Sequence, residues 1–153
     1  MLKITENYVD DKFEQNVIEL IPKEKKNTFH RNHILRYGCK IPYLPFHVSD
    51  EIPEFLLQVK DFEYNSVSIN EYYEGQEIGW HIDHILAGPE IHIISLLNDG
   101  ILNFRKKNEK KDVFLPRFSL VTISDELRYE WEHHFKATTP RISVVFRNSN
   151  FNL

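Results

Sequence analysis

The feature that most constrains the fold is a succession of short segments rich in β-branched and aromatic residues in the second half of the chain. Turn residues separate these segments, and no helical pattern lies between them. Such a succession is typical of a jelly roll or a related barrel. We expect strands near residues 66–73, 79–83, 92–97, 101–105, 113–115, 119–124, 130–135 and 142–146, with a tight hairpin turn at Asn98-Asp99-Gly100.

The first 60 residues have a different pattern. Phe13, Val17, Ile18 and Ile21 recur at helical spacing, and Pro22 marks the expected end of that helix. No repeat or linker divides the chain. We therefore predict a single α+β domain over residues 1–153, in which a helical, lid-like N-terminal part (1–60) packs on a jelly-roll core (66–148).

Composition excludes several functional classes. A net charge of −4 argues against a protein that binds nucleic acid through its overall field. The single cysteine, Cys39, excludes an internal disulfide and a zinc site built of thiolates, and five glycines leave no room for a phosphate-binding glycine-rich loop. No apolar run approaches the roughly 20 residues of a membrane helix. We expect an intracellular monomer with no membrane association.

The segment from Gly79 to Asp83 carries the most informative chemistry. Side chains alternate between the two faces of a strand, so His81 and Asp83 are predicted to point the same way. One imidazole and one carboxylate on one face make two adjacent ligands for a divalent metal. A His-x-Asp triplet alone is weak support, because it often occurs by chance.

A third ligand is offered by residues 128–136. Read as a strand, this segment places Tyr129, Trp131, His133 and Phe135 on one apolar face, and His134 among charges on the other. A histidine on an apolar face is more often a core residue than a ligand. With the His-x-Asp pair, however, His133 would complete two histidines and one carboxylate, a set that suits non-haem iron(II) oxygenases. A zinc hydrolase can use the same side chains, so the triad alone does not select the reaction.

The last predicted strand adds a second constraint. Arg141, Ser143, Val145 and Arg147 share one face of it, and the other face is apolar. Unpaired buried charge is costly, so two guanidinium groups facing a core require partners. A dicarboxylate ligand would pair with arginine through parallel hydrogen bonds. The alternative is that both arginines pair with Asp or Glu of the protein itself.

Together these motifs resemble those of the AlkB family of 2-oxoglutarate dioxygenases. The resemblance extends over residues 66–148, and its N-terminal continuation is limited to Arg36-Tyr37-Gly38 and the stretch 42–45. The motifs that carry it are, in order, Asn70-Glu71-Tyr72, His81-x-Asp83, Arg128-Tyr129-x-Trp131-x-His133 and Arg141-x-Ser143-x-x-Phe146-Arg147.

The resemblance implies a double-stranded β-helix, the jelly roll of this family, and an oxygenase that uses Fe(II), 2-oxoglutarate and O2. It implies that Fe(II) is held by His81, Asp83 and His133. The expected reaction hydroxylates a substrate C–H bond. If that bond belongs to an N-methyl group, the hydroxylated product would release formaldehyde.

The same resemblance assigns the 2-oxoglutarate site. Asn70 and Tyr72 would hydrogen-bond the co-substrate, and Arg141 would pair with its distal carboxylate. Arg147 would lie near the end that chelates iron, and Ser143 occupies a position where the family often has a small polar residue.

The substrate is less constrained. Six aromatic and cationic residues occur where the lid of the family would be, and they either stack and hold a flipped base or pack the helical layer on the sheet. They are Phe29, His30, Arg31, Tyr37, Tyr43 and Phe46. The basic segment 105–111 either contacts a phosphate backbone or forms a solvated hairpin.

Three functions remain open at this level. The AlkB-like tract around His133 favours an alkylated base in RNA or DNA as the substrate. The negative net charge and the absence of a recognisable lid favour a protein side chain or a small molecule instead. A jelly-roll binding module without turnover is the third, and the complete set of metal ligands and arginines argues against it.

Overall fold

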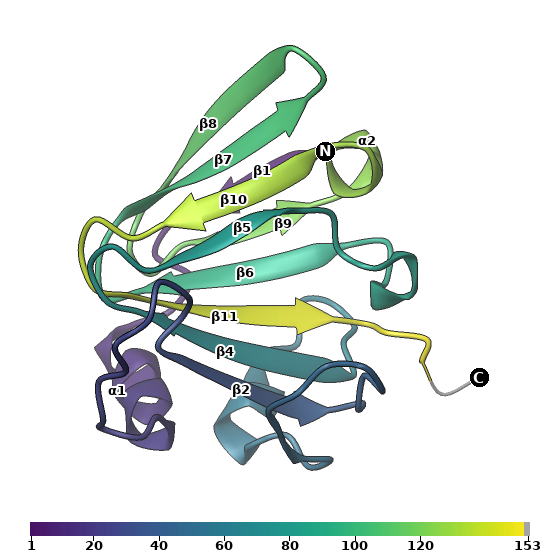
Figure 1. The fold of residues 1–153 in the computed structure, drawn as a ribbon. Coiled ribbons are helices and arrows are strands. Elements are labelled where there is room, and N and C mark those ends of the chain that lie inside the picture. The colour runs from purple at the N-terminus through teal and green to yellow at the C-terminus, as the bar shows by residue number, and fades with distance from the viewer. Residues whose placement is uncertain (152–153) are drawn as a thin grey trace.

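Two β-sheets form the body of the molecule, and the computed structural model describes residues 1–151 (Figure 1). The larger sheet has the order β1-β9-β6-β11-β4-β2-β3, and every pairing in it except β2 with β3 is antiparallel. Its strands are β1 (Leu2–Thr5), β9 (Leu120–Ile123), β6 (Ile91–Leu96), β11 (Arg141–Arg147), β4 (Ser66–Tyr72), β2 (His33–Gly38) and β3 (His47–Ser49). The smaller, antiparallel sheet has the order β5 (Glu77–His81), β10 (Glu132–Lys136), β7 (Gly100–Lys106) and β8 (Glu109–Leu115).

The expected strands of the second half are all present, within a few residues of their predicted limits. The turn at Asn98-Asp99-Gly100 was predicted wrongly, because it does not close a hairpin. β6 belongs to the larger sheet and β7 to the smaller one, so the chain crosses between sheets here. The polar side chains tie neighbouring loops instead: Asn98 donates to the carbonyl of Pro140, and Asp99 accepts from the backbone N–H of Arg117.

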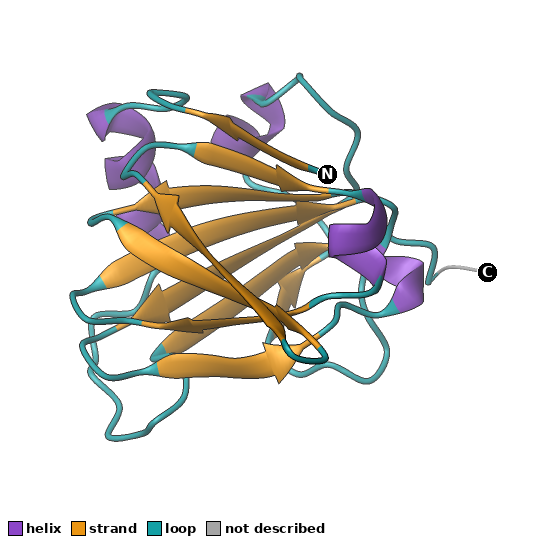
Figure 2. Cartoon of the chain, turned by 90° about the horizontal axis from the view of Figure 1, so that it is seen from above, coloured by secondary structure: helices purple, strands orange, loops and turns teal. Residues whose placement is uncertain are grey.

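The N-terminal part is less helical than expected, since it also supplies β1, β2 and β3 to the larger sheet. The predicted helix is α1 (Asp11–Leu20), whose N-terminus is capped by Asp10 through the backbone N–H of Phe13. The remaining helical elements are short: η1 (Glu54–Gln58), η2 (Ile85–Ala87) and α2 (Asp125–Tyr129). Figure 2 shows these helices around the strands and not between them. None of the helices in the described residues is long and apolar enough to cross a membrane.

The segment 128–136, read as a strand from the sequence with its predicted limits at 130 and 135, divides into two elements. Arg128 and Tyr129 end helix α2, and only Glu132–Lys136 forms a strand. A helical turn fits here because Asp125 and Glu126 place negative charge at its N-terminus and Arg128 places positive charge near its C-terminus. Trp131, between the two elements, is still buried.

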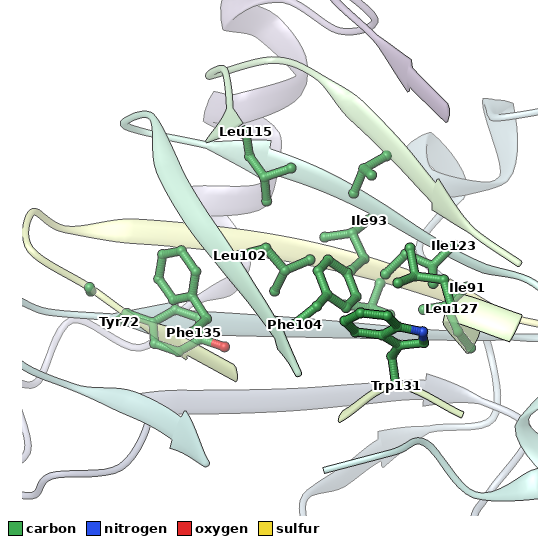
Figure 3. Packing of buried hydrophobic residues seen from close by; sticks show 13 residues of the cluster. Tyr72, Ile91, Ile93, Leu102, Phe104, Leu115, Ile123, Leu127, Trp131 and Phe135 are labelled. Carbon is green, nitrogen blue, oxygen red and sulfur yellow. The ribbon is translucent and has the colours of Figure 1, made fainter. Parts of the chain in front are cut away.

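The larger sheet has hydrophobic clusters on both faces. Between the two sheets lies a cluster that includes Phe104, Trp131 and Phe135 (Figure 3). On the opposite face, Val17 of α1 and Leu56 of η1 pack with Phe146 and its neighbours. Because the packing between the two sheets is otherwise apolar, buried polar side chains in that space indicate where a functional site lies.

Candidate active site

His81, Asp83 and His133 come together because His81 of β5 pairs in register with His133 of β10, and Asp83 lies beside both. Oδ1 of Asp83 lies 3.4 Å from Nε2 of His81 and 3.5 Å from Nε2 of His133. Their ligand atoms all lie within 4.8 Å of one another. Donors that are each about 2.0–2.2 Å from one ion have separations of this order. The arrangement therefore fits a single divalent metal ion.

The protonation states suit metal binding. Burial lowers the pKa of His133 to about 4, so its imidazole is neutral at neutral pH. Burial alone would raise the pKa of Asp83, but the charge of Arg147 and hydrogen bonding to His81 hold that pKa well below its usual range. Nδ1 of His81 lies 2.7 Å from the carbonyl oxygen of Gly79, and donation to that carbonyl leaves Nε2 free as a ligand.

Asp83 is positioned by long-range contacts, because β5 ends at His81 and the aspartate lies in the loop that follows. Arg147 of β11 donates from Nε to Oδ2 of Asp83 at 2.7 Å. Arg128 of α2 donates to three backbone carbonyls in the same loop, those of Asp83 (3.1 Å), His84 (2.8 Å) and Gly88 (2.9 Å). These two arginines fix both the side chain and the main chain of the loop.

A narrow inner cavity of about 50 Å³ extends from this centre between the sheets. Neighbouring strands of the larger sheet line one side of it, since Ser143 of β11 pairs in register with Asn70 of β4, and Arg141 pairs with Tyr72. Seven of the eight predicted site residues line it: Asn70, Tyr72, His81, His133, Arg141, Ser143 and Arg147. The eighth, Asp83, lines the adjoining outer cavity.

Arg141 has the environment expected of a ligand-binding arginine. Its side chain is 3% exposed, and burial lowers its pKa to about 10. Nη2 donates to the hydroxyl of Ser95 at 3.0 Å, and Nε has no hydrogen-bond partner. Within residues 1–151, no carboxylate forms an ion pair with this side chain. A bound carboxylate would supply the missing acceptor.

Arg147 matches the alternative prediction, in which the arginine pairs with a carboxylate of the protein itself, because it pairs with Asp83. This pair joins the end of β11 to the metal-binding loop. The two arginines of the predicted face therefore differ. Arg147 holds a proposed metal ligand, whereas Arg141 has no carboxylate partner among the described residues.

An outer cavity of about 340 Å³ adjoins the inner one and shares Arg31, Arg36, Ile78, His81 and Arg147 with it. Tyr43, His84 and Phe151 form a cluster of rings on its wall, with centroid separations of 5.6 Å, 5.9 Å and 5.0 Å. Two of the three candidate metal ligands, His81 and Asp83, line this cavity.

The aromatic residues of the N-terminal part do not share one role. Tyr37 is buried in the core, as the packing interpretation requires. Phe29, Tyr43 and Phe46 are 84%, 58% and 52% exposed. The basic segment 105–111 forms the end of the β7–β8 hairpin, in which Lys106 pairs with Glu126 and Glu130 of the protein.

Three features of the site were not assigned from the sequence. Arg128 was recognised only as part of a motif, and its three bonds to backbone carbonyls depend on the helical turn that was predicted as a strand. Arg36 reaches the site because β2 pairs with β4, which sets it opposite Ser68. His84 and Phe151 line the outer cavity from loops, where no periodic pattern indicates direction.

Comparison with known proteins gives distant relatives. No protein-family model matches the sequence. The chain is 25% identical over 174 residues to the uncharacterized protein L905 of Acanthamoeba polyphaga mimivirus, which covers 95% of this chain and 83% of that protein.

Two further relatives carry the name tRNA (carboxymethyluridine(34)-5-O)-methyltransferase ALKBH8. The Xenopus tropicalis protein is 28% identical over 162 residues, which cover 92% of this chain and 25% of that protein. The Macaca fascicularis protein is 37% identical over 71 residues, which cover 45% of this chain and 11% of that protein. The chain thus corresponds to a quarter or less of either methyltransferase.

Among solved structures, OsALKBH1 matches with a TM-score of 0.68 and 12% sequence identity, over 96% of this chain and 97% of that one. The matched length includes the N-terminal part as well as the two sheets. The chain therefore has the jelly-roll fold of the AlkB homologues, with a minor helical layer.

Proposed function

We propose that this protein is an Fe(II)- and 2-oxoglutarate-dependent dioxygenase. One observation carries the proposal: the two histidines and Asp83 adjoin an inner cavity that also contains Arg141, a buried arginine without a carboxylate partner in the described residues. A zinc hydrolase needs the metal ligands but gives no reason for that arginine. A co-substrate with a distal carboxylate accounts for both.

In this proposal His81, Asp83 and His133 hold the metal, and Arg141 holds the distal carboxylate of 2-oxoglutarate. Tyr72 and Asn70 line the same cavity and orient the co-substrate by hydrogen bonds. Bound Fe(II) with 2-oxoglutarate and O2 supplies the oxidising power for hydroxylating a C–H bond. The surrounding apolar cluster keeps water away from this end of the site.

For the substrate we propose an alkylated nucleobase in RNA or DNA. The similarity to proteins named for a tRNA uridine supports a nucleic acid, and the rings of Tyr43, His84 and Phe151 offer faces on which a base can stack. The net charge of −4 supports an alternative, the same chemistry on a protein side chain or a small molecule.

The deciding experiment measures succinate formation by anaerobically purified protein given Fe(II), 2-oxoglutarate and air. Turnover is expected in the wild type and in Asp112→Ala, which removes an exposed carboxylate that accepts only from Asn103. It should vanish in Asp83→Ala. Methylated RNA and DNA oligonucleotides, followed by peptides, would then be screened for substrate-stimulated succinate release.

If the wild type neither turns over nor binds Fe(II) and 2-oxoglutarate, the oxygenase proposal is wrong and the fold serves as a binding module. Binding of both without turnover would show that the true substrate is needed to start the reaction. Equal turnover in Asp83→Ala and wild type would exclude this metal centre as its source.

A further inference from the structure

The outer cavity holds more positive charge than the proposed reaction requires. Arg31, Arg36 and Arg147 line it, and Asp83 is the only carboxylate in its wall within the described residues. That carboxylate already pairs with Arg147. The cavity therefore has two cations, Arg31 and Arg36, without a counter-charge.

Neither of these two arginines has a carboxylate partner in residues 1–151. Nη1 of Arg31 donates to Oδ1 of Asn70 at 2.9 Å, and Nε of Arg36 donates to the carbonyl of Pro45 at 3.0 Å. Burial, together with the charges of Arg31 and Arg147, lowers the pKa of Arg36 to about 10. The three guanidinium groups thus repel one another in a partly desolvated space, which is costly unless an anion binds there.

The proposed co-substrate does not account for this charge. 2-Oxoglutarate has two carboxylates, of which one is assigned to Arg141 and the other to the metal beside Arg147. Arg141 lines only the inner cavity, whereas Arg31 and Arg36 also line the outer one. A further anionic group is therefore expected on the substrate side of the metal centre.

The aromatic residues that line the outer cavity indicate what carries this group. Tyr43 is 58% exposed, and its ring meets those of His84 and Phe151 in one cluster. Exposed rings around a cavity of about 340 Å³ suit a flat, partly apolar ligand. Arg36 and Tyr43 line this one cavity, so the cationic and aromatic side chains border a common space.

We propose that the outer cavity recognises a substrate in which a flat ring carries its own anionic group, a carboxylate or a phosphate, with the ring against Tyr43, His84 and Phe151 and the anion on Arg31 and Arg36. The proposal rests on the proposed function, because it assigns the substrate side of the same site. It makes these two arginines determinants of substrate specificity, distinct from the arginine that holds the co-substrate.

The test measures binding, not turnover, in protein loaded with Zn(II) and saturated with 2-oxoglutarate. The probes are two matched pairs, phenyl phosphate with phenol and benzoate with benzamide, observed by ligand-detected NMR. Each anion should bind at least about tenfold more tightly than its neutral partner, and its affinity should fall as salt is raised. The pair with the larger ratio distinguishes a phosphate from a carboxylate.

Variants connect the preference to the two arginines. Arg36→Met and Arg31→Met should each reduce the anion preference about tenfold, and Arg36→Lys should restore part of it. Arg105→Met is the matched control, because Arg105 lies over Trp80 and pairs with Glu132, and lines neither cavity. Thermal unfolding of each variant verifies that it is folded.

Two results would overturn the proposal: equal binding of anionic and neutral probes, or binding of the anions only when 2-oxoglutarate is left out, which would assign both arginines to the co-substrate. An equal loss in Arg105→Met would also contradict it. Because no turnover is involved, any of these results could occur beside normal succinate formation, and the proposed oxygenase would then stand.

Discussion

Arg147 donates a hydrogen bond of 2.7 Å to Oδ2 of Asp83, and the other oxygen of that carboxylate faces the two histidines. The carboxylate is thereby oriented before any metal binds. Arg147 is an indirect determinant of the metal centre, since it holds a ligand without being one.

Replacing Arg147 by methionine should lower the affinity for divalent metal by about 10–100-fold, the usual effect of losing a group that orients a ligand. Arg147→Lys should lie between this variant and the wild type, because an ammonium group can hold the carboxylate but not in the same geometry. Calorimetric titration with Co(II) measures the affinity. Unchanged affinity in Arg147→Met would show that Asp83 is oriented without it.

Replacing Arg141 by methionine should separate ligand binding from stability. Its guanidinium has no carboxylate partner in the described residues, so the free energy of unfolding of the ligand-free protein should not fall. The affinity for 2-oxoglutarate should fall by about 10–100-fold, as expected when a charge-assisted pair is lost. Thermal unfolding with and without 2-oxoglutarate tests both statements. A variant that is destabilised yet still stabilised by 2-oxoglutarate would contradict them.

The pair Glu14–Arg117 should make stability depend on pH. Burial alone would raise the pKa of Glu14, but hydrogen bonds from Arg117 and from the backbone N–H of Leu97 lower it below its ordinary value of 4.5. Because the folded-state pKa is the lower one, this contribution is complete above pH 4.5 and is lost as the pH falls through the folded value.

Glu14→Gln should therefore cost about 1–3 kcal/mol at pH 7 and progressively less as the pH falls through the folded-state pKa, where the wild type loses the same interaction. Chemical denaturation over a series of pH values from 7 downward measures the difference. A cost that does not change with pH would mean that the charge of Glu14 does not contribute.

Gly38 is predicted to tolerate no side chain. Its φ is +86°, and an added Cβ would lie 2.3 Å from the carbonyl oxygen of Asn65, which already accepts from Cys39. Gly38→Ala should cost about 2–5 kcal/mol through backbone strain and overpacking. Gly75→Ala is the matched control, with a φ of +87° and no atom within 4 Å of the added Cβ. It should lose only the strain, about 1–2 kcal/mol. Equal losses in urea denaturation would show that the contact with Asn65 has no effect.

Local patterns predicted those parts of the molecule that depend on alternation along one strand. The arrangement of Arg141 and Ser143 on one face follows from their spacing, and the structure places both on the inner cavity. Spacing also suggested that His81 and Asp83 would meet, although Asp83 reaches this position from a loop and not from the strand.

What the sequence did not predict depends on pairing between distant segments. Arg36 lies at the site because β2 pairs with β4, and the sequence pattern of β2 alone does not show that β4 is its neighbour. The turn at 98–100 has the residue types of a hairpin, but the choice between a hairpin and a crossing is made by which sheet buries the next strand. Helix α2 is only five residues long, too short for a hydrophobic period to distinguish it from a strand.

Arg128 donates hydrogen bonds to three backbone carbonyls of the loop after β5, and this has a consequence for protein design. The aspartate of the His-x-Asp triplet is placed by a residue 45 positions further along the chain, which acts on its main chain. A designer who copied the triplet and the distal histidine onto another jelly roll would transfer the ligands without the anchor that aligns them. The smallest transferable unit of the proposed metal centre is therefore β5 with its following loop, the strand that carries His133, and the two elements that carry Arg128 and Arg147.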